Sequence, residues 1–324
     1  MAERGVGHLT GKFDDAARAA WLYFVAGKTQ DEIAGKMSVS RQTAQRLISL
    51  AISERLVRVT LEHPIAECMR LADDICARFG LATCDVSPSD AGSAQAGLGA
   101  IHSAARMIER WLGSDKPVVM ALGTGRSMRA AVDQVAAMDC PAHRLVSLVG
   151  NISADGSASY YDVISYLAGR VKAHYYPMPL PVVARSSEER RLLTELATVR
   201  SVAALARGAD VAFVGIGHVG PNAPLREDGF ISAAELDDLI AGGGVGEIVG
   251  WVFDRDGKVL AGRTNARVAS VHVGDLTGGA RIAVATGAKK AAAIRAALAG
   301  GLVTGLVTDE ATARLILGGG KRGK

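Results

Sequence analysis

Four short glycine-containing segments carry polar residues that could bind a small ligand. The first leads from an apolar run into a helical pattern, and its candidate ligand-binding positions are Gly123, Thr124, Gly125, Arg126 and Ser127. Backbone N–H groups and hydroxyls that meet at a helix N-terminus suit a phosphate or the hydroxyls of a polyol. A simple strand-to-helix turn is the alternative. The segment is not a P-loop, because the ending GK[ST] is missing.

The second segment, GIGHVG at residues 215–220, matches the pattern GxGxxG of dinucleotide-binding folds. That pattern requires a helix directly afterwards, whereas the sequence PNAP occupies residues 221–224 here. We therefore expect no NAD site, and nothing else in the sequence indicates a cofactor. Gly217 and His218 are instead expected on the rim of a ligand site, and a turn without a ligand is the alternative.

The other two segments each contribute one charged candidate. Glu247 is expected on a glycine-rich loop before a strand, where an ionised carboxylate can accept hydrogen bonds from two sugar hydroxyls. Lys290 falls in the opening turn of a helix, where the helix dipole disfavours a cation unless an anionic group neutralises it. We expect Lys290 to bind a phosphate or carboxylate of the ligand, with a solvated surface lysine as the alternative. The sequence DRDG at residues 254–257 predicts a hairpin turn.

Residues 29–48 have the pattern of a helix-turn-helix. Thr29 and Glu32 have the spacing of a capping box, and Ser40 stands where a second helix needs its N-cap. Residues 1–60 hold nine basic and six acidic residues, and the second helix contains no acid, which favours contact with phosphates. The candidates for contacts with base edges and phosphates of double-stranded DNA are Ser40, Arg41, Gln42, Thr43, Gln45 and Arg46.

The flanking sequence predicts the elements around this motif. Asp14 and Asp15 are expected to cap the preceding helix, and the alternation in residues 56–64 predicts a strand of a wing. After Pro64, apolar residues recur at helical spacing. The expected organisation is a winged helix-turn-helix DNA-binding domain at 1–62, a linker helix at 63–83, an effector-binding and oligomerisation domain at 84–318 and a flexible tail at 319–324.

From Cys84 onward, short runs rich in Val, Ile and Leu alternate with alanine-rich helical stretches. Strands that read as continuous apolar runs between helices are typical of a parallel sheet that is covered on both faces. The larger domain is therefore predicted to be a Rossmann-like, mainly parallel α/β sheet. In such sheets, ligands bind beyond the carboxyl ends of the strands.

Several classes of protein are disfavoured by the composition. The four cysteines form no CxxC pair, so neither a metal site nor a disulfide framework is predicted; they are Cys68, Cys76, Cys84 and Cys140. No stretch is apolar for long enough to span a membrane, and no secretory signal is present, so we expect a soluble, cytoplasmic protein. Neither GxSxG nor HExxH occurs and no catalytic residues stand out, so an enzyme is not expected.

Taken in order, these motifs resemble the SorC family of bacterial transcriptional regulators over nearly the whole chain. The resemblance rests on the helix-turn-helix stretch and on PVVMALGTGRSM, DVAFVGIG, GFISAAELDDLIAGGGVGEIVGWVFDRDGKVL and RIAVATGAKKAAAIRAALAGGLVTGLVTDEATARLIL. It implies a homodimeric or homotetrameric repressor or activator, whose effector domain is similar in fold to phosphosugar isomerases and deaminases. It also implies that Gly123 to Ser127, Glu247 and Lys290 line the effector site. The chain departs from the family at Thr124, where an aromatic residue is usual, and at Thr286, where glycine is usual.

The sequence thus predicts a DNA-binding regulator of a carbohydrate or polyol operon, controlled by a sugar, polyol or sugar phosphate. Such an effector must bind the DNA-competent and DNA-incompetent states unequally, since equal binding shifts no population. Two alternatives remain: a phosphosugar isomerase or deaminase with an appended DNA-binding domain, and a DNA-binding protein that ignores small molecules.

Overall fold

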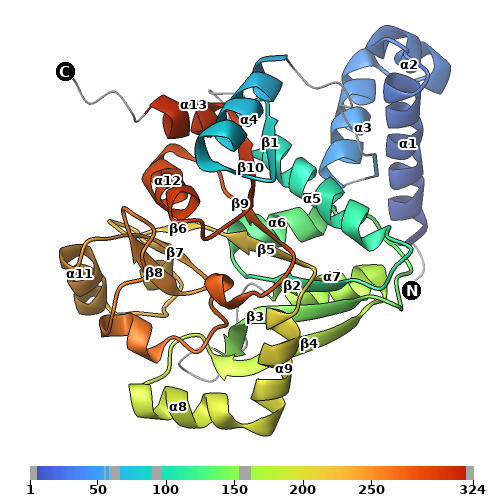
Figure 1. The fold of residues 1–324 in the computed structure, drawn as a ribbon. Helices are drawn as coiled ribbons and strands as arrows, with labels where there is room; N and C mark the ends of the chain where they lie inside the picture. Colours follow the sequence, from blue (N-terminus) through green and yellow to red (C-terminus); the bar gives the residue numbers. More distant parts are fainter. Residues whose placement is uncertain (1–5, 55, 58–65, 90–96, 153–161, 319–324) are drawn as a thin grey trace. The chain divides into compact units, whose positions relative to one another are not determined.

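The computed structural model describes residues 6–54, 56–57, 66–89, 97–152 and 162–318 of the 324-residue chain. The chain divides into two compact units, Met1–Pro64 and Ile65–Lys324. The first contains three helices and the second contains the sheets (Figure 1). Within the described residues, no helix has both the length and the apolar character needed to cross a membrane.

The first unit is a three-helix bundle made of α1 (Val6–Phe24), α2 (Gln30–Met37) and α3 (Arg41–Ser53). Its core consists mainly of small and branched apolar residues: Ala16, Ala19, Ala20, Ile33, Ala34, Ala44, Leu47, Ile48 and Ala51. The predicted capping box of Thr29 and Glu32 is confirmed, as is the N-cap Ser40. The predicted cap at Asp14 and Asp15 is wrong, because α1 already begins at Val6 and both side chains are exposed within it. The predicted wing at 56–64 lies outside the described residues except for Leu56 and Val57.

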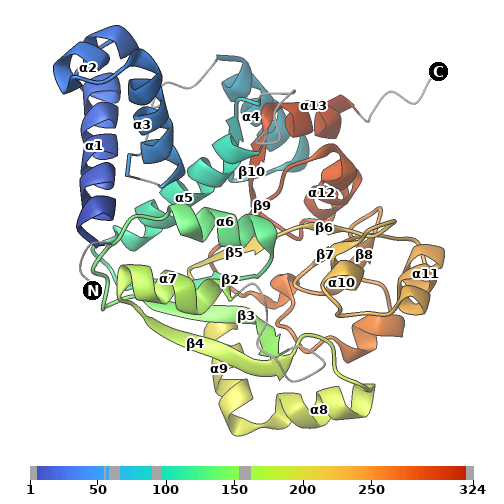
Figure 2. The same ribbon diagram turned by 180° about the vertical axis from the view of Figure 1, so that it is seen from behind.

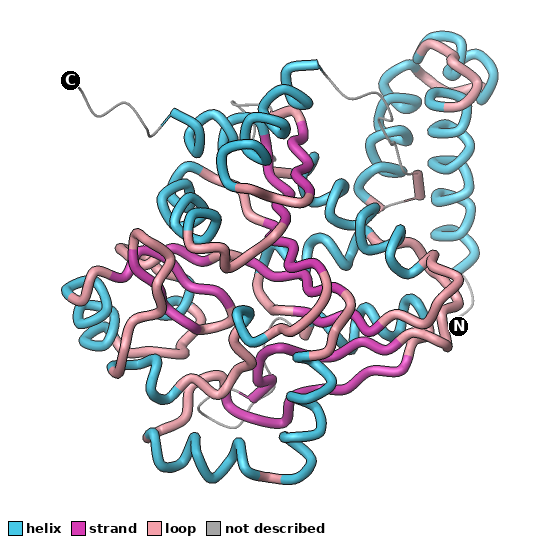
Figure 3. The backbone as a smooth tube through the Cα atoms, in the orientation of Figure 1, coloured by secondary structure: helices cyan, strands magenta, loops and turns pink. Residues whose placement is uncertain are grey.

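The second unit is built on a seven-stranded sheet in the order β1-β10-β9-β5-β2-β3-β4, visible as magenta strands in Figure 3. All neighbouring strands in it are parallel, which confirms the predicted fold class. The strands are β1 (Thr83–Ser87), β2 (Val119–Leu122), β3 (Arg144–Ile152), β4 (His174–Pro181), β5 (Val211–Gly215), β9 (Ala280–Val284) and β10 (Gly305–Asp309).

Helices cover both faces of this sheet (Figures 1 and 2). Because successive side chains of a strand point to opposite faces, Met120 and Leu122 pack in one apolar cluster and Val119 and Ala121 in another. The first cluster includes α5 (Leu98–Leu112), α6 (Arg126–Gln134) and α7 (Val163–Val171). The second includes α4 (Ala66–Phe79), α9 (Ala197–Arg207), α12 (Ala291–Ala299) and α13 (Glu310–Gly318).

A smaller antiparallel sheet of β6 (Gly217–His218), β7 (Gly244–Ile248) and β8 (Trp251–Asp254) was not predicted from the sequence. Val249 and Gly250 connect β7 to β8 with φ of 48° and 88°, and two positive φ values are what a type I′ hairpin turn requires. The remaining helical segments are α8 (Ser187–Glu195), α10 (Pro224–Glu227), α11 (Ala233–Ala241), η1 (Arg263–Arg267), η2 (Val273–Asp275) and η3 (Ala288–Lys290).

The order of the strands alone indicates where a ligand can bind. From β2 the chain proceeds outward through β3 and β4, and from β5 it proceeds in the other direction through β9 and β10. β2 and β5 are therefore neighbours whose connections diverge to opposite sides. A crevice opens beyond the carboxyl ends of two such strands, and ligands of doubly wound sheets bind in it.

Candidate functional site

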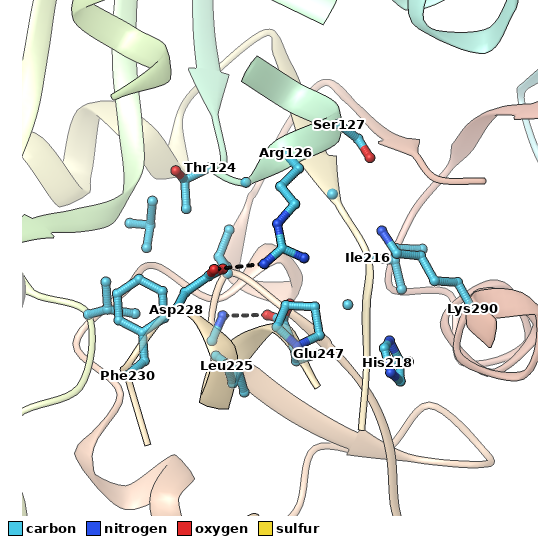
Figure 4. Close-up of a pocket in the computed structure, with 18 of the residues that line it drawn as sticks. Thr124, Arg126, Ser127, Ile216, His218, Leu225, Asp228, Phe230, Glu247 and Lys290 are labelled. Carbon is cyan, nitrogen blue, oxygen red and sulfur yellow. Dashed lines mark hydrogen bonds and ion pairs between the residues drawn. The ribbon is translucent and has the colours of Figure 1, made fainter. Parts of the chain in front are cut away.

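A pocket of about 160 Å³ lies beyond the carboxyl ends of β2 and β5 (Figure 4). Eight of the nine predicted effector-binding residues line it: Thr124, Gly125, Arg126, Ser127, Gly217, His218, Glu247 and Lys290. The ninth, Gly123, sits at the end of β2, where its N–H donates to the carbonyl of Phe213 at 2.8 Å. A Cβ on Gly123 would lie 3.3 Å from both Val214 Cα and Val249 Cγ1, so the glycine allows close packing behind the pocket.

One side of the pocket is formed by an ion-paired arginine. Arg126, at the start of α6, donates from Nη2 to Asp228 at 3.0 Å and to Glu227 at 3.2 Å. Burial raises the pKa of Asp228, although the neighbouring Arg126 acts in the opposite direction. The positive charge of Arg126 is therefore already matched by acidic groups beside it.

The pocket also holds a carboxylate, Glu247, and an amine, Lys290 (Figure 4). Glu247 accepts a hydrogen bond from the N–H of Gly250 at 2.8 Å. Burial raises the pKa of Glu247, opposed by that hydrogen bond and by the charge of Lys290. Burial also lowers the pKa of Lys290, opposed by the charge of Glu247. Each charged group thus stabilises the other in a site where water solvates neither fully.

Glu247 lies within strand β7, and its expected position on a loop is wrong. The glycines around it read as a loop, but they are required by packing. A Cβ on Gly246 would lie 2.6 Å from Ala293 Cβ and 2.7 Å from Phe253 Cζ. Only glycine lets this strand approach α12 and β8 so closely, and that approach fixes where the Glu247 side chain enters the pocket.

His218 brings a hydrogen-bonding atom that the protein leaves unused. Its Nε2 lies 3.2 Å from the carbonyl of Pro221, so this nitrogen carries the proton in the neutral ring. Its Nδ1 is buried and has no hydrogen-bond partner among the described residues. A hydroxyl of a bound ligand could donate to this nitrogen.

Several pocket residues were not predicted from the sequence, most importantly Asp228, Asn222 and Phe230. They follow the GIGHVG segment in a stretch without strong periodicity. The acidic pair Glu227–Asp228 was the available signal, since it stands just after a segment already expected on the pocket rim. Among the described residues, no group of three or more His, Cys, Asp or Glu side chains is placed to hold a metal ion.

Alanine at Gly217 is expected to destabilise the fold by about 1–3 kcal/mol, the usual range for overpacking. The added Cβ would lie 2.1 Å from Glu247 Oε1, so the carboxylate must move. Chemical denaturation of the purified variant measures the loss. Gly220→Ala is the matched control three residues along the chain, because its Cβ would meet only His218 Cδ2 at 3.8 Å. Equal losses of stability in both variants would contradict the prediction.

The recognition candidates lie on α3 of the first unit. Ala44, Leu47, Ile48 and Ala51 are buried on one face of this helix. The opposite face exposes Arg41, Gln42, Gln45 and Arg46. Ser40 and Thr43 are engaged with each other through the helix cap, with 3.1 Å between Thr43 N and Ser40 Oγ. Arg41 Nε lies 3.6 Å from Asp31 Oδ1. Gln42, Gln45 and Arg46 protrude from the same face and have no ion pair among the described residues.

Comparison with known proteins agrees with this architecture. Residues 63–318 match the family model described as "Putative sugar-binding domain". The erythritol catabolism regulatory protein EryD of Brucella abortus is 35% identical over 308 residues, covering 94% of this chain and 96% of EryD. The transcriptional regulator LsrR of Escherichia coli K12 is 30% identical over 316 residues, covering 94% of both chains.

The fold is also shared with a solved regulator. The full-length sorbitol operon regulator SorC from Klebsiella pneumoniae superposes with a TM-score of 0.72 at 24% identity, covering 93% of this chain and 97% of that chain. The family resemblance inferred from the sequence motifs is confirmed. The chain belongs to the SorC family of transcriptional regulators, which carry a sugar-binding domain.

Proposed function

We propose that the protein is a cytoplasmic, DNA-binding regulator of a polyol or carbohydrate operon and that its effector is a small, uncharged polyol. The observation that carries the choice of a polyol is the charge balance of the pocket. Arg126 is paired with Asp228 and Glu227. The charge of Glu247 acts on Lys290, although the two side chains form no ion pair among the described residues. A phosphate group would need a cation that is not already matched, whereas hydroxyls can use the carboxylates as acceptors.

The size of the pocket supports the same choice. Its volume of about 160 Å³ lies below the roughly 300–1,000 Å³ of most ligand pockets. A small polyol therefore suits this pocket better than a larger sugar. The name of EryD, which concerns the catabolism of the four-carbon polyol erythritol, is consistent with this size.

The remaining assignments follow from the division of the chain. We place DNA reading on α3, with Ser40, Arg41, Gln42, Thr43, Gln45 and Arg46 in contact with the operator, and effector binding and assembly in the second unit. A homodimer or homotetramer presents two such helices to two half-sites. An effector that prefers one assembly then changes DNA occupancy by shifting the population.

The direct test is a gel shift with the DNA upstream of the protein's own gene at a fixed salt concentration. Four- to six-carbon polyols are compared with the phosphate esters of the same polyols. We expect a polyol to change the shift and its phosphate ester to have no effect at the same concentration. A response to the phosphate ester alone would reject the uncharged effector but keep the regulator.

Catalysis is the second candidate, because shifted pKa values of Glu247 and Lys290 in one pocket are also typical of active sites. An isomerase or deaminase would convert a sugar phosphate, and proton NMR of the purified protein with sugar phosphates would detect turnover. We expect no turnover, because the acidic groups that disfavour a phosphorylated effector in this pocket also disfavour a phosphorylated substrate.

The affinity for the polyol is expected to fall as the pH is lowered from neutrality. Burial raises the pKa of Glu247 above its usual value, so its carboxylate gains a proton at a higher pH than an exposed glutamate and then accepts hydrogen bonds less well. Calorimetric titration between about pH 5 and 8 measures this. In Glu247→Gln the acid-side loss should disappear; if it persists unchanged, another group is responsible.

A further inference from the structure

A second cavity of the sheet unit has about 560 Å³ and shares no lining residue with the effector pocket. Helices α8 and α9, strands β4 and β8 and the segment 269–275 form its walls. Helix α9 packs on β3 and β4, so the cavity belongs to the face of the sheet shown in Figure 1.

This cavity is strongly cationic. Arg190, Arg200 and Arg207 line it, and Asp275 is the one carboxylate among the lining residues. Within the described part of the chain, none of the three arginines forms an ion pair. By contrast, the neighbouring Arg191 on α8 is held by Glu188 at 2.7 Å and Glu195 at 2.9 Å. Among the described residues, the cavity therefore carries three arginine charges without an ion-paired carboxylate.

Two of the residues that line this cavity each have a buried polar atom without a hydrogen-bond partner among the described residues: Arg190 Nε and Ser270 Oγ. Ser270 is only 6% exposed, so bulk water does not compensate for its missing partner. Buried polar groups without partners are rare because each is costly. Their presence in one cavity indicates a ligand that accepts from the arginine and bonds to the hydroxyl.

The wall around these atoms can hold a ring. The guanidinium of Arg190 lies 5.5 Å from the centre of the Trp251 ring, and the His272 ring meets Trp251 edge-on at 5.4 Å. Trp251 Nε1 donates to the carbonyl of Ser270 at 3.1 Å, which fixes the indole. The apolar lining residues are Met178, Val199, Val259, Ala203, Ala269 and Val271.

We propose that this second cavity binds a small organic anion, a carboxylate or phosphate monoester with an apolar or aromatic body. The anionic group is held by Arg190 and Ser270, with Arg200 and Arg207 at the mouth, and the body lies along Trp251. The site is independent of the polyol pocket, so the regulator has room for a second metabolite of a different chemical class.

Calorimetric titration of the full-length protein with phenyl phosphate, at constant ionic strength, tests the proposal. The wild type is compared with Arg190→Gln, with Arg191→Gln as the matched loss of charge one residue along α8, and with Lys290→Gln in the other pocket. We expect Arg190→Gln to bind about tenfold or more weakly, as loss of a charge-assisted hydrogen bond predicts. The other two variants should bind like the wild type.

Exposed Arg200 supplies a second test in case Arg190→Gln does not fold, and Arg200→Gln is also expected to weaken binding. Inorganic phosphate should bind more weakly than phenyl phosphate because it lacks the apolar body. Equal binding by Arg190→Gln and Arg191→Gln would overturn the proposal. The proposal would also be overturned if the wild type did not bind phenyl phosphate and Arg190→Gln lost self-association. In that case the cavity would receive an acidic side chain of a second copy of the chain.

Discussion

Arg46→Ala is expected to weaken binding to operator DNA by about tenfold to a hundredfold, because a bidentate contact to a base contributes about 1–3 kcal/mol. Arg46 is exposed on the face of α3 opposite the buried core residues, and no ion pair restrains it among the described residues. If Arg46 instead contacts a phosphate, the loss should be similar for all sequences and the salt dependence should weaken. Gel shifts at two salt concentrations, with operator and unrelated DNA, separate these contacts.

Arg18→Ala provides the control for this experiment. Arg18 is exposed on α1, so its loss changes the charge of the same three-helix unit by the same amount without altering α3. Polyol binding should be unchanged in both variants, because the pocket lies in the other unit. Equal DNA affinity of Arg46→Ala and the wild type would remove Arg46 from the DNA-binding surface.

The helix-turn-helix could be predicted from the sequence because its signals are local. The capping box of Thr29 and Glu32 and the cap at Ser40 involve residues three positions apart, and the hydrogen bonds expected from that spacing are present. The start of α1 was misplaced because Asp14 and Asp15 fit a cap as well as an exposed position inside a helix. The sequence alone does not distinguish an aspartate that caps a helix from an exposed aspartate within it.

The parallel sheet was also predictable, since the central strands β2 (VMAL) and β5 (VAFVG) are continuous apolar runs, although the edge strands β1 (TCDVS) and β4 (HYYPMPLP) are not. The order of the strands was not predictable, because the order depends on contacts between strands far apart in the chain, such as β2 with β5 and β1 with β10. That order creates the crevice that brings Thr124 and Gly217 to the same pocket. The family resemblance connected these residues to one effector site, and the topology supplies the physical reason for their proximity.

The antiparallel sheet escaped prediction because glycine weakens every strand signal. In GVGEI, residues 244–248, buried and half-buried positions alternate as expected for a strand. Two of the buried positions are glycines, whose missing side chains leave room for neighbouring groups. Val249 adds a second difficulty, because a β-branched residue with φ of 48° occupies a conformation that such residues rarely adopt. Backbone strain of this kind often accompanies functional sites, and here it occurs in a residue that lines the pocket.

Glu247→Gln is expected to lower the affinity for the polyol effector by roughly tenfold to a hundredfold, since hydrogen bonds to a charged group contribute about 1.5–3 kcal/mol. The amide keeps the shape of the side chain but offers one acceptor atom in place of two. Calorimetric titration with the responsive polyol measures the change. Glu310→Gln, which removes a carboxylate paired with Arg314 at 2.8 Å on α13, is the control and should bind normally.

Removing both charges separates binding from folding. Glu247→Gln alone leaves the half-buried Lys290 without the opposing charge of Glu247, and removing one of two interacting charges away from bulk water is destabilising. In the double variant Glu247→Gln/Lys290→Gln neither charge remains, and burial disfavours the charged form of both residues. We therefore expect the double variant to unfold at a temperature at or above that of the wild type while binding the polyol weakly. If the unfolding temperature of the double variant falls as far as that of Glu247→Gln, the two charges contribute more to folding than to ligand binding. If stability is kept and binding is lost, these charges are retained at the expense of stability because the effector uses them.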